Sequence, residues 1–120
     1  MHQEIYWIFT VSVKPGRFDE FKKLVVEIVA ETRKEAGALA YEYSVSSDQS
    51  TVHVFERYRD SAAVVTHIDQ TFGRFADRFM SLVTPAGFVV YGTPDEEARG
   101  KLDGMGAVYM TLFDGFRRWE

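Results

Sequence analysis

The sequence contains no cysteine and no asparagine, no long apolar run and no excess of basic residues. Without cysteine there is no disulfide scaffold, no thiol nucleophile and no zinc site built on thiolates. No stretch approaches the roughly 20 apolar residues of a membrane span, and none has the pattern of a signal peptide. The net charge of -4 argues against a basic face for nucleic acid. We therefore expect a cytoplasmic protein with no membrane or nucleic-acid partner.

The length and the aromatic content are the next informative features. The 120 residues suit one domain with a core of its own, and aromatic residues make up 15% of the chain, more than a small core normally needs. No repeat, low-complexity segment or linker divides the sequence. We expect residues 1–92 to form the main module and residues 93–120 to add a helix and a strand to the same domain.

Hydrophobic periodicity predicts the secondary structure. Alternation of apolar and polar residues indicates strands over 5–13, 38–45, 51–59, 88–91 and 107–113. Helical spacing indicates a helix over 17–34, two consecutive segments after Asp60, which is expected to cap the first, and a short helix over 93–104. We expect Gly37 to end the first helix through a positive φ angle.

The order of these elements predicts the fold. The series β-α-β-β-α(α)-β-α-β contains the split βαβ arrangement of a ferredoxin-like α+β domain with an antiparallel sheet. Helices would cover one face, while outward positions such as Tyr6, Ile8 and Phe55 carry large side chains on the other. Pairing two sheets face to face would bury that surface, so we expect a homodimer. The C-terminal strand would either join its own sheet or reach across to the partner.

Two segments resemble the antibiotic biosynthesis monooxygenase family. They are the Val-Lys-Pro-Gly-Arg-Phe-Asp-Glu-Phe turn into a helix at 13–21, and the Val-Phe-Glu-Arg-Tyr-Arg-Asp-Ser-Ala-Ala run at 54–63 followed by His67. The resemblance covers about residues 3–92. It implies a dimeric α+β barrel with a small-molecule pocket between helices and sheet in each subunit. Characterised relatives oxidise quinols or aromatic polyketides with O2 and without metal or flavin, and another branch degrades haem.

His67 is the first candidate for chemistry. An imidazole near neutral pKa can take a proton from a phenol or quinol and so generate the anion that reacts with O2. The alternative is a structural histidine that orients its helix by a hydrogen bond to a strand residue such as Glu56.

Glu56 and Tyr58 are the next two candidates. They share a strand face with apolar side chains, which predicts a partly buried carboxyl group with a shifted pKa. The alternative for Glu56 is an ion pair with an arginine such as Arg57 or Arg59, of a neighbouring strand or of the partner subunit. Tyr58 stands where the family pattern often has tryptophan, and it would keep an aromatic wall there.

An aromatic stripe at helical spacing supplies candidate substrate-binding residues. Phe72, Phe75 and Phe79, together with Trp7, could line a pocket for a small planar aromatic molecule. The alternative is that the stripe belongs to the core. A cavity of several hundred cubic ångströms would favour a ligand pocket, whereas a filled core would leave no room for chemistry.

Several site types are not expected. His53 falls on the strand face opposite Glu56, and His2 stands at the terminus, so no iron or other metal site is predicted. The Gly104-Met105-Gly106 segment precedes a strand, which does not suit a phosphate loop. No histidine follows His67, so the axial ligand of the haem-degrading relatives has no counterpart, and neither have the family's catalytic asparagines.

The sequence thus leads to one main hypothesis and one alternative. The main hypothesis is a cofactor-independent monooxygenase that acts on a small quinol or hydroxylated aromatic, with His67 as base or orienting donor. The alternative is a non-catalytic dimeric barrel that binds a small apolar ligand or serves as a stress-related module.

Overall fold

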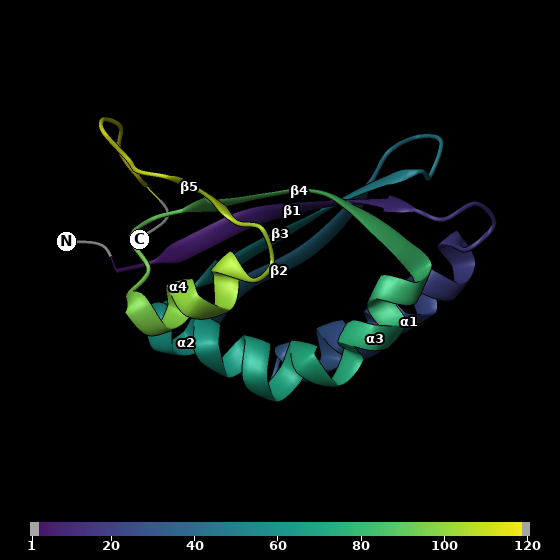
Figure 1. The fold of residues 1–120 in the computed structure, drawn as a ribbon, viewed down its shortest axis with the longest axis horizontal. Coiled ribbons are helices and arrows are strands. Elements are labelled where there is room, and N and C mark those ends of the chain that lie inside the picture. Colours follow the sequence, from purple (N-terminus) through teal and green to yellow (C-terminus); the bar gives the residue numbers. More distant parts are fainter. Residues whose placement is uncertain (1–2, 119–120) are drawn as a thin grey trace.

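The computed structural model describes residues 3–118 as one sheet with its helices packed on a single face (Figure 1). In chain order the elements are β1 (Ile5–Val13), α1 (Phe18–Thr32), β2 (Ala38–Val45), β3 (Thr51–Tyr58), α2 (Ser61–Thr66), the π-helix η1 (His67–Phe72), α3 (Gly73–Leu82), β4 (Val83–Tyr91), α4 (Glu96–Asp103) and β5 (Val108–Met110). Within residues 3–118, no helix combines the length and apolarity that crossing a membrane requires.

The strands lie in the order β2-β3-β1-β4-β5. The first four pair antiparallel, as a ferredoxin-like α+β domain requires, so the predicted fold class is confirmed. The fifth strand runs parallel to β4, with α4 as the crossover between them. Of the two places considered for the C-terminal strand, the chain uses the edge of its own sheet.

Some predicted boundaries are wrong. The fourth strand begins at Val83 rather than residue 88. It continues past Pro85 through an irregularity in which Ala86 is the extra residue, where the register with β1 shifts between Thr10 and Val11. The last strand is limited to Val108–Met110, since the chain leaves β4 after three pairs. The first helix ends at Thr32, and Gly37 is not in the positive-φ region, so the predicted role of Gly37 as a helix stop is wrong.

Gly37 has a packing role instead. A Cβ atom at this position would lie 2.6 Å from the Cβ of Ala63, which is closer than two carbon atoms can approach. The start of β2 therefore passes directly over α2, and only a residue without a side chain permits this contact. Asp60 caps α2 as predicted, because its side chain accepts a hydrogen bond from the Ala63 amide at 2.9 Å.

We expect Gly37→Ala to lower the free energy of unfolding by about 1–3 kcal/mol, because the added methyl group overpacks the contact with Ala63. Gly100→Ala is the matched control, since a Cβ there meets nothing within 4 Å inside α4. The control should leave stability unchanged or raise it by up to about 1 kcal/mol. Urea unfolding of both variants measures the difference. Equal stability of the two would contradict the close approach of β2 to α2.

The core lies between the sheet and the helices. The odd-numbered residues of β1 all point into it, as their alternation predicts, and each is buried. Phe21, Leu24 and Ile28 of α1 and Phe79 of α3 pack against this face. Because β1 is the central strand of the sheet, its inward side chains lie in the middle of the core. Trp7 and Phe9 are two of these side chains.

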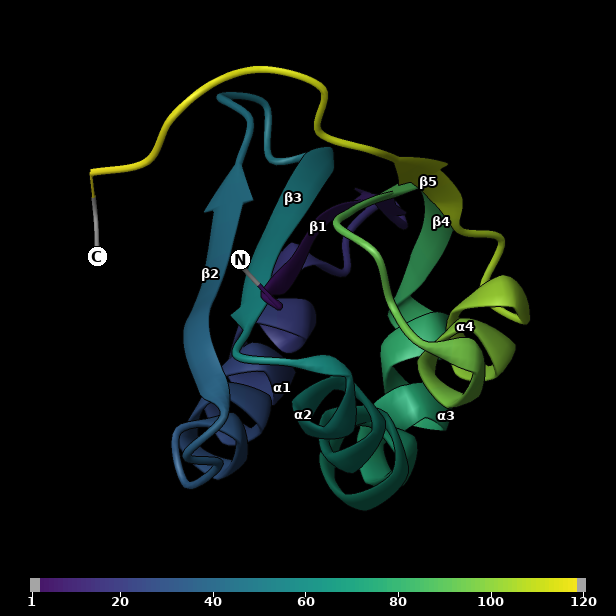
Figure 2. The ribbon, with the colours of Figure 1, turned by 90° about the vertical axis from the view of Figure 1, so that its left-hand side faces the viewer.

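The outer face of the sheet is covered by no helix of the described residues (Figure 2). Tyr6 stacks on Tyr91 there with ring centroids 5.0 Å apart, and Phe55 lies beside them. After β5, residues 111–118 run past this face toward β2, with Arg117 over the Tyr6 ring. Phe113 in this arm is 98% exposed. The face and the arm together present the large apolar surface that the aromatic surplus predicts.

Candidate functional site

His67 lies between two carboxyl groups in the interior. It begins η1 directly after α2, and its side chain is 2% exposed. Nδ1 is 3.0 Å from Oε2 of Glu35, and Nε2 is 3.5 Å from Oε1 of Glu56. Both ring nitrogens therefore face an acidic group.

Glu56 lies on the inward face of β3, opposite Trp7 in the sheet register. Its Oε1 accepts a hydrogen bond of 2.5 Å from the hydroxyl of Tyr58, which shares this face two residues along the strand. Burial raises the pKa of Glu56, while His67 and hydrogen bonds from Tyr58 and Trp7 partly oppose the rise. A carboxyl group in this setting holds its proton at higher pH than an exposed one.

The intrachain arginine partner considered for Glu56 is not found. Arg57 forms its ion pair with Glu4, and Arg59 lies 3.7 Å from Asp60, because both arginines point away from the core face of β3. Histidine rather than arginine faces the Glu56 carboxyl within the chain. The pair therefore joins a buried carboxyl group with a raised pKa to an imidazole.

Glu35 is the site residue that sequence reasoning missed. It follows α1 in the turn before β2, and its side chain is 11% exposed. In a turn no periodicity fixes the direction of a side chain, so the sequence offered no signal that Glu35 would contact His67.

The roles of the two ring nitrogens depend on the tautomer of the imidazole. When Nδ1 of His67 donates to the Glu35 carboxyl group, the neutral ring carries its lone pair on Nε2. Nε2 is then left with its lone pair directed toward Glu56 and the interior. A histidine oriented through one nitrogen and basic at the other is the arrangement that general-base catalysis uses.

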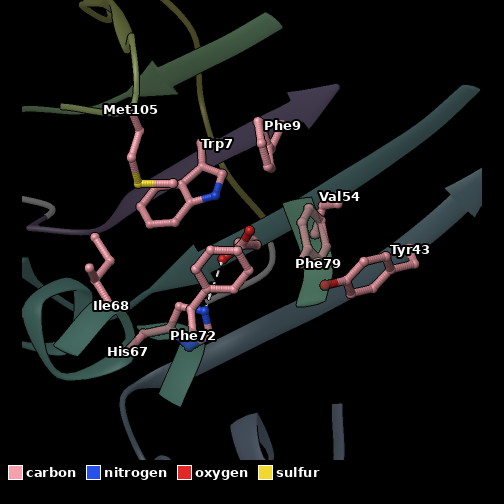
Figure 3. Close-up of a pocket in the computed structure, with 10 residues that line it drawn as sticks. Trp7, Phe9, Tyr43, Val54, His67, Ile68, Phe72, Phe79 and Met105 are labelled. Carbon is pink, nitrogen blue, oxygen red and sulfur yellow. Dashed lines mark ion pairs between the residues drawn. The ribbon is translucent and has the colours of Figure 1, made fainter. Parts of the chain in front are cut away.

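A small cavity adjoins this group (Figure 3). It has a volume of about 10 Å³, which is room for roughly one water molecule. It is largely apolar, with Glu56, His67 and the Tyr43 hydroxyl as its polar members; the other lining residues are Trp7, Phe9, Val54, Ile68, Phe72, Phe79 and Met105. The structure thus places Glu56 and His67 in the lining of a small, nearly filled cavity whose other walls are mostly aromatic side chains.

The predicted site residues divide into three groups. Trp7, Phe72 and Phe79 line the cavity together with Glu56 and His67. Tyr58 is fully buried, outside the cavity lining, and contacts Glu56. Phe75 does not line the cavity. Its ring lies against the guanidinium of Arg74, which is 5.6 Å from the ring centroid.

Two further lining residues come from segments that gave no site signal. Ile68 belongs to η1, where the chain departs from the α-helical spacing on which the prediction relied. Met105 belongs to the turn between α4 and β5 and is far from the cavity in sequence. Only the three-dimensional path of the C-terminal segment brings it there.

The histidines and the glutamate that were considered for an iron site do not come together in the described part of the chain. His53 is exposed on the outer face, whereas Glu56 and His67 lie beneath the helices. Across residues 3–118, no group of three or more histidine or acidic side chains is placed to hold a metal ion. His2 lies outside the described residues.

The fold and the site define a ferredoxin-like α+β protein with an internal acid–histidine–acid array. Residues 5–71 match the family model for antibiotic biosynthesis monooxygenases, and the chain belongs to this family. The resemblance noted in the sequence is therefore confirmed. No curated protein matches the sequence.

Solved structures share the fold. MupZ from Pseudomonas fluorescens is 21% identical, with a TM-score of 0.87 over 98% of this chain and 97% of that chain. Rv0793 from Mycobacterium tuberculosis is 24% identical, with a TM-score of 0.67 over 78% and 97% of the two chains. A Caulobacter crescentus protein named for the same family is 23% identical, with a TM-score of 0.63 over 74% and 86%. The match to MupZ extends through α4 and β5.

Proposed function

We propose that the protein is a cofactor-independent monooxygenase acting on a small quinol or hydroxylated aromatic molecule. One observation carries the proposal: His67 contacts Glu35 through Nδ1 and Glu56 through Nε2, and it lines a cavity walled by aromatic side chains. Family membership supports oxygen chemistry, and the lining supports a flat apolar substrate with one acidic hydroxyl or C–H group.

The proposed reaction balances with O2 as the only co-reactant. For a substrate with a ring CH2 beside a hydroxylated ring, Nε2 removes one proton and the electron pair stays on the substrate anion. The anion forms a C–O bond to O2, and the resulting peroxide takes the proton back from His67. Loss of the second C–H proton and cleavage of the O–O bond release water. The sum is CH2 + O2 → C=O + H2O, in which the carbon loses four electrons and O2 gains four.

The other residues of the array support this chemistry through His67. Glu35 holds the imidazole in the tautomer that leaves Nε2 basic. Glu56, with its raised pKa, is placed 3.5 Å from Nε2, where it can hold or return a proton during the reaction. Tyr58 fixes the Glu56 carboxyl by donating to Oε1. The aromatic walls exclude bulk water from the reactive anion.

Oxygen uptake by metal-stripped protein tests the proposal. A panel of hydroquinones, naphthols and anthrones is offered in an oxygen electrode cell, and the products are analysed for incorporation of ¹⁸O from ¹⁸O2. We expect uptake above the spontaneous rate for at least one member, with one labelled oxygen in the product. Uptake at the spontaneous rate for the whole panel, with ligand binding intact, would contradict a monooxygenase.

The nearly filled cavity also suits a protein without catalytic activity, which is the second candidate function. With room for only one water molecule, the cavity holds no substrate, and a small apolar ligand would enter only if the lining moved. A non-catalytic protein needs no base exposed to a substrate and no path for O2. The same assays separate the two functions, since a binding protein would retain the panel compound unchanged.

We also propose that the chain forms a homodimer through the outer face of its sheet. The face carries half-buried Ile8 and Phe55, and no helix of the described residues covers it. We expect light scattering to give twice the mass of one chain, and Ile8→Glu to give a monomer, because the charge would lie in the interface. Val26→Glu, at an apolar position of α1 that is 68% exposed, is the control. A monomeric wild-type protein would contradict this proposal.

A further inference from the structure

Met105 reaches the cavity from outside the segment that defines the family. The family model ends at residue 71, whereas Met105 lies in the turn between α4 and β5. In Figure 3 its side chain extends toward the Trp7 ring, opposite η1. A methionine thioether against an aromatic ring is a favourable contact, but it also occupies space that a flat ligand would use. Met105 thus closes one end of the cavity.

Something in the lining has to move before any aromatic molecule can enter. A cavity that holds benzene in a protein has roughly 150 Å³, against the 10 Å³ found here. Trp7, Phe9 and Val54 belong to paired central strands and cannot move without breaking the sheet. Phe72 packs edge-on against buried Phe79 at 5.2 Å. Met105 is the lining residue with an unbranched, flexible side chain and a half-exposed position.

The backbone around Met105 forms a hydrogen-bonded turn, in which the Met105 amide donates to the Leu102 carbonyl at 3.0 Å and the Gly106 amide donates to the Asp103 carbonyl at 3.1 Å. Gly104 and Gly106 flank Met105, both are exposed, and Gly106 has a φ angle of +78° with open space around its Cβ position. The elements on either side are fixed. Lys101 of α4 pairs with Asp69 of η1 at 3.0 Å. The Met105 side chain can therefore leave the cavity by rotation about its own bonds while the turn keeps its hydrogen bonds.

The other anchor of this turn is Tyr109 in β5. Its hydroxyl donates to Asp103 at 2.6 Å, and Arg99 stacks over its ring at 4.1 Å. These contacts tie β5 back to α4 across the turn. The backbone is thereby held on both sides of the turn, and Met105 is the side chain of residues 104–106 that lines the cavity.

We infer that Met105 is a plug that fills the ligand subsite of the cavity and sets which ligands it accepts. The inference rests on the proposed function, since it concerns the same site. The ligand class is a planar aromatic alcohol of one or two rings. Its hydroxyl group lies at the Glu56–His67 end, and its ring takes the place of the methionine thioether beside Trp7. Larger ligands are rejected until the side chain at position 105 is shortened.

Methyl NMR of protein labelled with ¹³C-methyl methionine tests the inference without any turnover. The Trp7 ring current should displace the Met105 methyl signal, which is assigned by its loss in Met105→Ala. With 1-naphthol as the probe, we expect this signal to move to the position of an exposed methionine, while the Met80 signal on α3 stays in place. Met105→Ala should bind 1-naphthol roughly tenfold more tightly, because the plug no longer has to be displaced.

Met110→Ala is the matched control, since Met110 belongs to the same segment but is 50% exposed on β5, outside the cavity. It should bind 1-naphthol as the wild-type protein does. Binding that leaves the Met105 signal in place, with equal affinity in Met105→Ala, would overturn the plug but leave the proposed function standing. Absence of binding by the wild-type protein and by Met105→Ala would overturn both.

Discussion

Replacing His67 with glutamine is expected to lower the rate of oxygen uptake by roughly 10²–10⁴-fold, the usual contribution of a general base. Glutamine keeps the approximate size and polarity of the side chain but cannot take a proton at neutral pH. The rate of oxygen uptake cannot fall below the spontaneous rate of substrate oxidation, which limits the loss that can be measured. The measurement is initial oxygen uptake at saturating substrate, with circular dichroism to verify that the variant is folded.

Two further variants make this prediction specific. His53→Gln changes a histidine that is exposed on the outer face of the sheet, and we expect it to retain full activity. Glu35→Gln keeps an acceptor for the Nδ1 hydrogen but removes the charge that stabilises a protonated ring, so we expect a smaller loss than in His67→Gln. Full activity of folded His67→Gln would show that the base lies elsewhere.

Replacing Glu56 with glutamine is expected to raise the stability of the protein relative to wild type as pH rises, because burial disfavours the charged form of the carboxyl group. Burial raises the pKa of Glu56 above its ordinary value of 4.5, so the folded state binds this proton more tightly than the unfolded state. Below pH 4.5 the carboxyl is neutral in both states. As pH rises through the folded-state pKa, the wild-type protein therefore loses stability that the glutamine variant keeps.

Urea unfolding of both proteins between pH 4 and pH 8 measures this effect. The difference in unfolding free energy between Glu56→Gln and wild type should be near zero at pH 4 and should grow with pH. Glu42→Gln, at an exposed position on β2, should show no such growth. A Glu56→Gln variant that loses stability relative to wild type as pH rises would contradict this prediction. It would mean that His67 stabilises the ionised Glu56 carboxylate by more free energy than burial of the charge costs.

The sequence predicted the parts of the fold that depend on local pattern. Period-two alternation placed β1 at its observed bounds, and Asp60 was correctly identified as a helix cap. The errors fall where tertiary contacts decide. Gly37 is required by its contact with Ala63, a residue distant in sequence, rather than by its own φ angle. Pro85 lies in β4 beside the unpaired Ala86, because the register with β1 passes from Thr10–Gly87 to Val11–Pro85, and the partner strand is not visible in the local pattern.

The site was predictable only in part, for the same physical reason. Glu56 and Tyr58 could be paired because strand side chains alternate, and His67 stood out as a histidine on an apolar helical segment. Glu35 and Met105 come from turns, where no periodicity fixes the direction of a side chain. Phe75 was assigned to the pocket by α-helical spacing. The structure places a π-helix before it and leaves Phe75 outside the cavity lining.

The central claim is that His67 deprotonates a bound aromatic molecule, and an anaerobic absorption titration with a hydroxyanthrone tests it most directly. Without O2 the reaction stops at the substrate anion, whose spectrum is shifted to long wavelength. We predict that the wild-type protein at pH 7 binds the compound as its anion and that His67→Gln binds it in the neutral form. Neutral spectra in both complexes would contradict the assignment of His67 as the base.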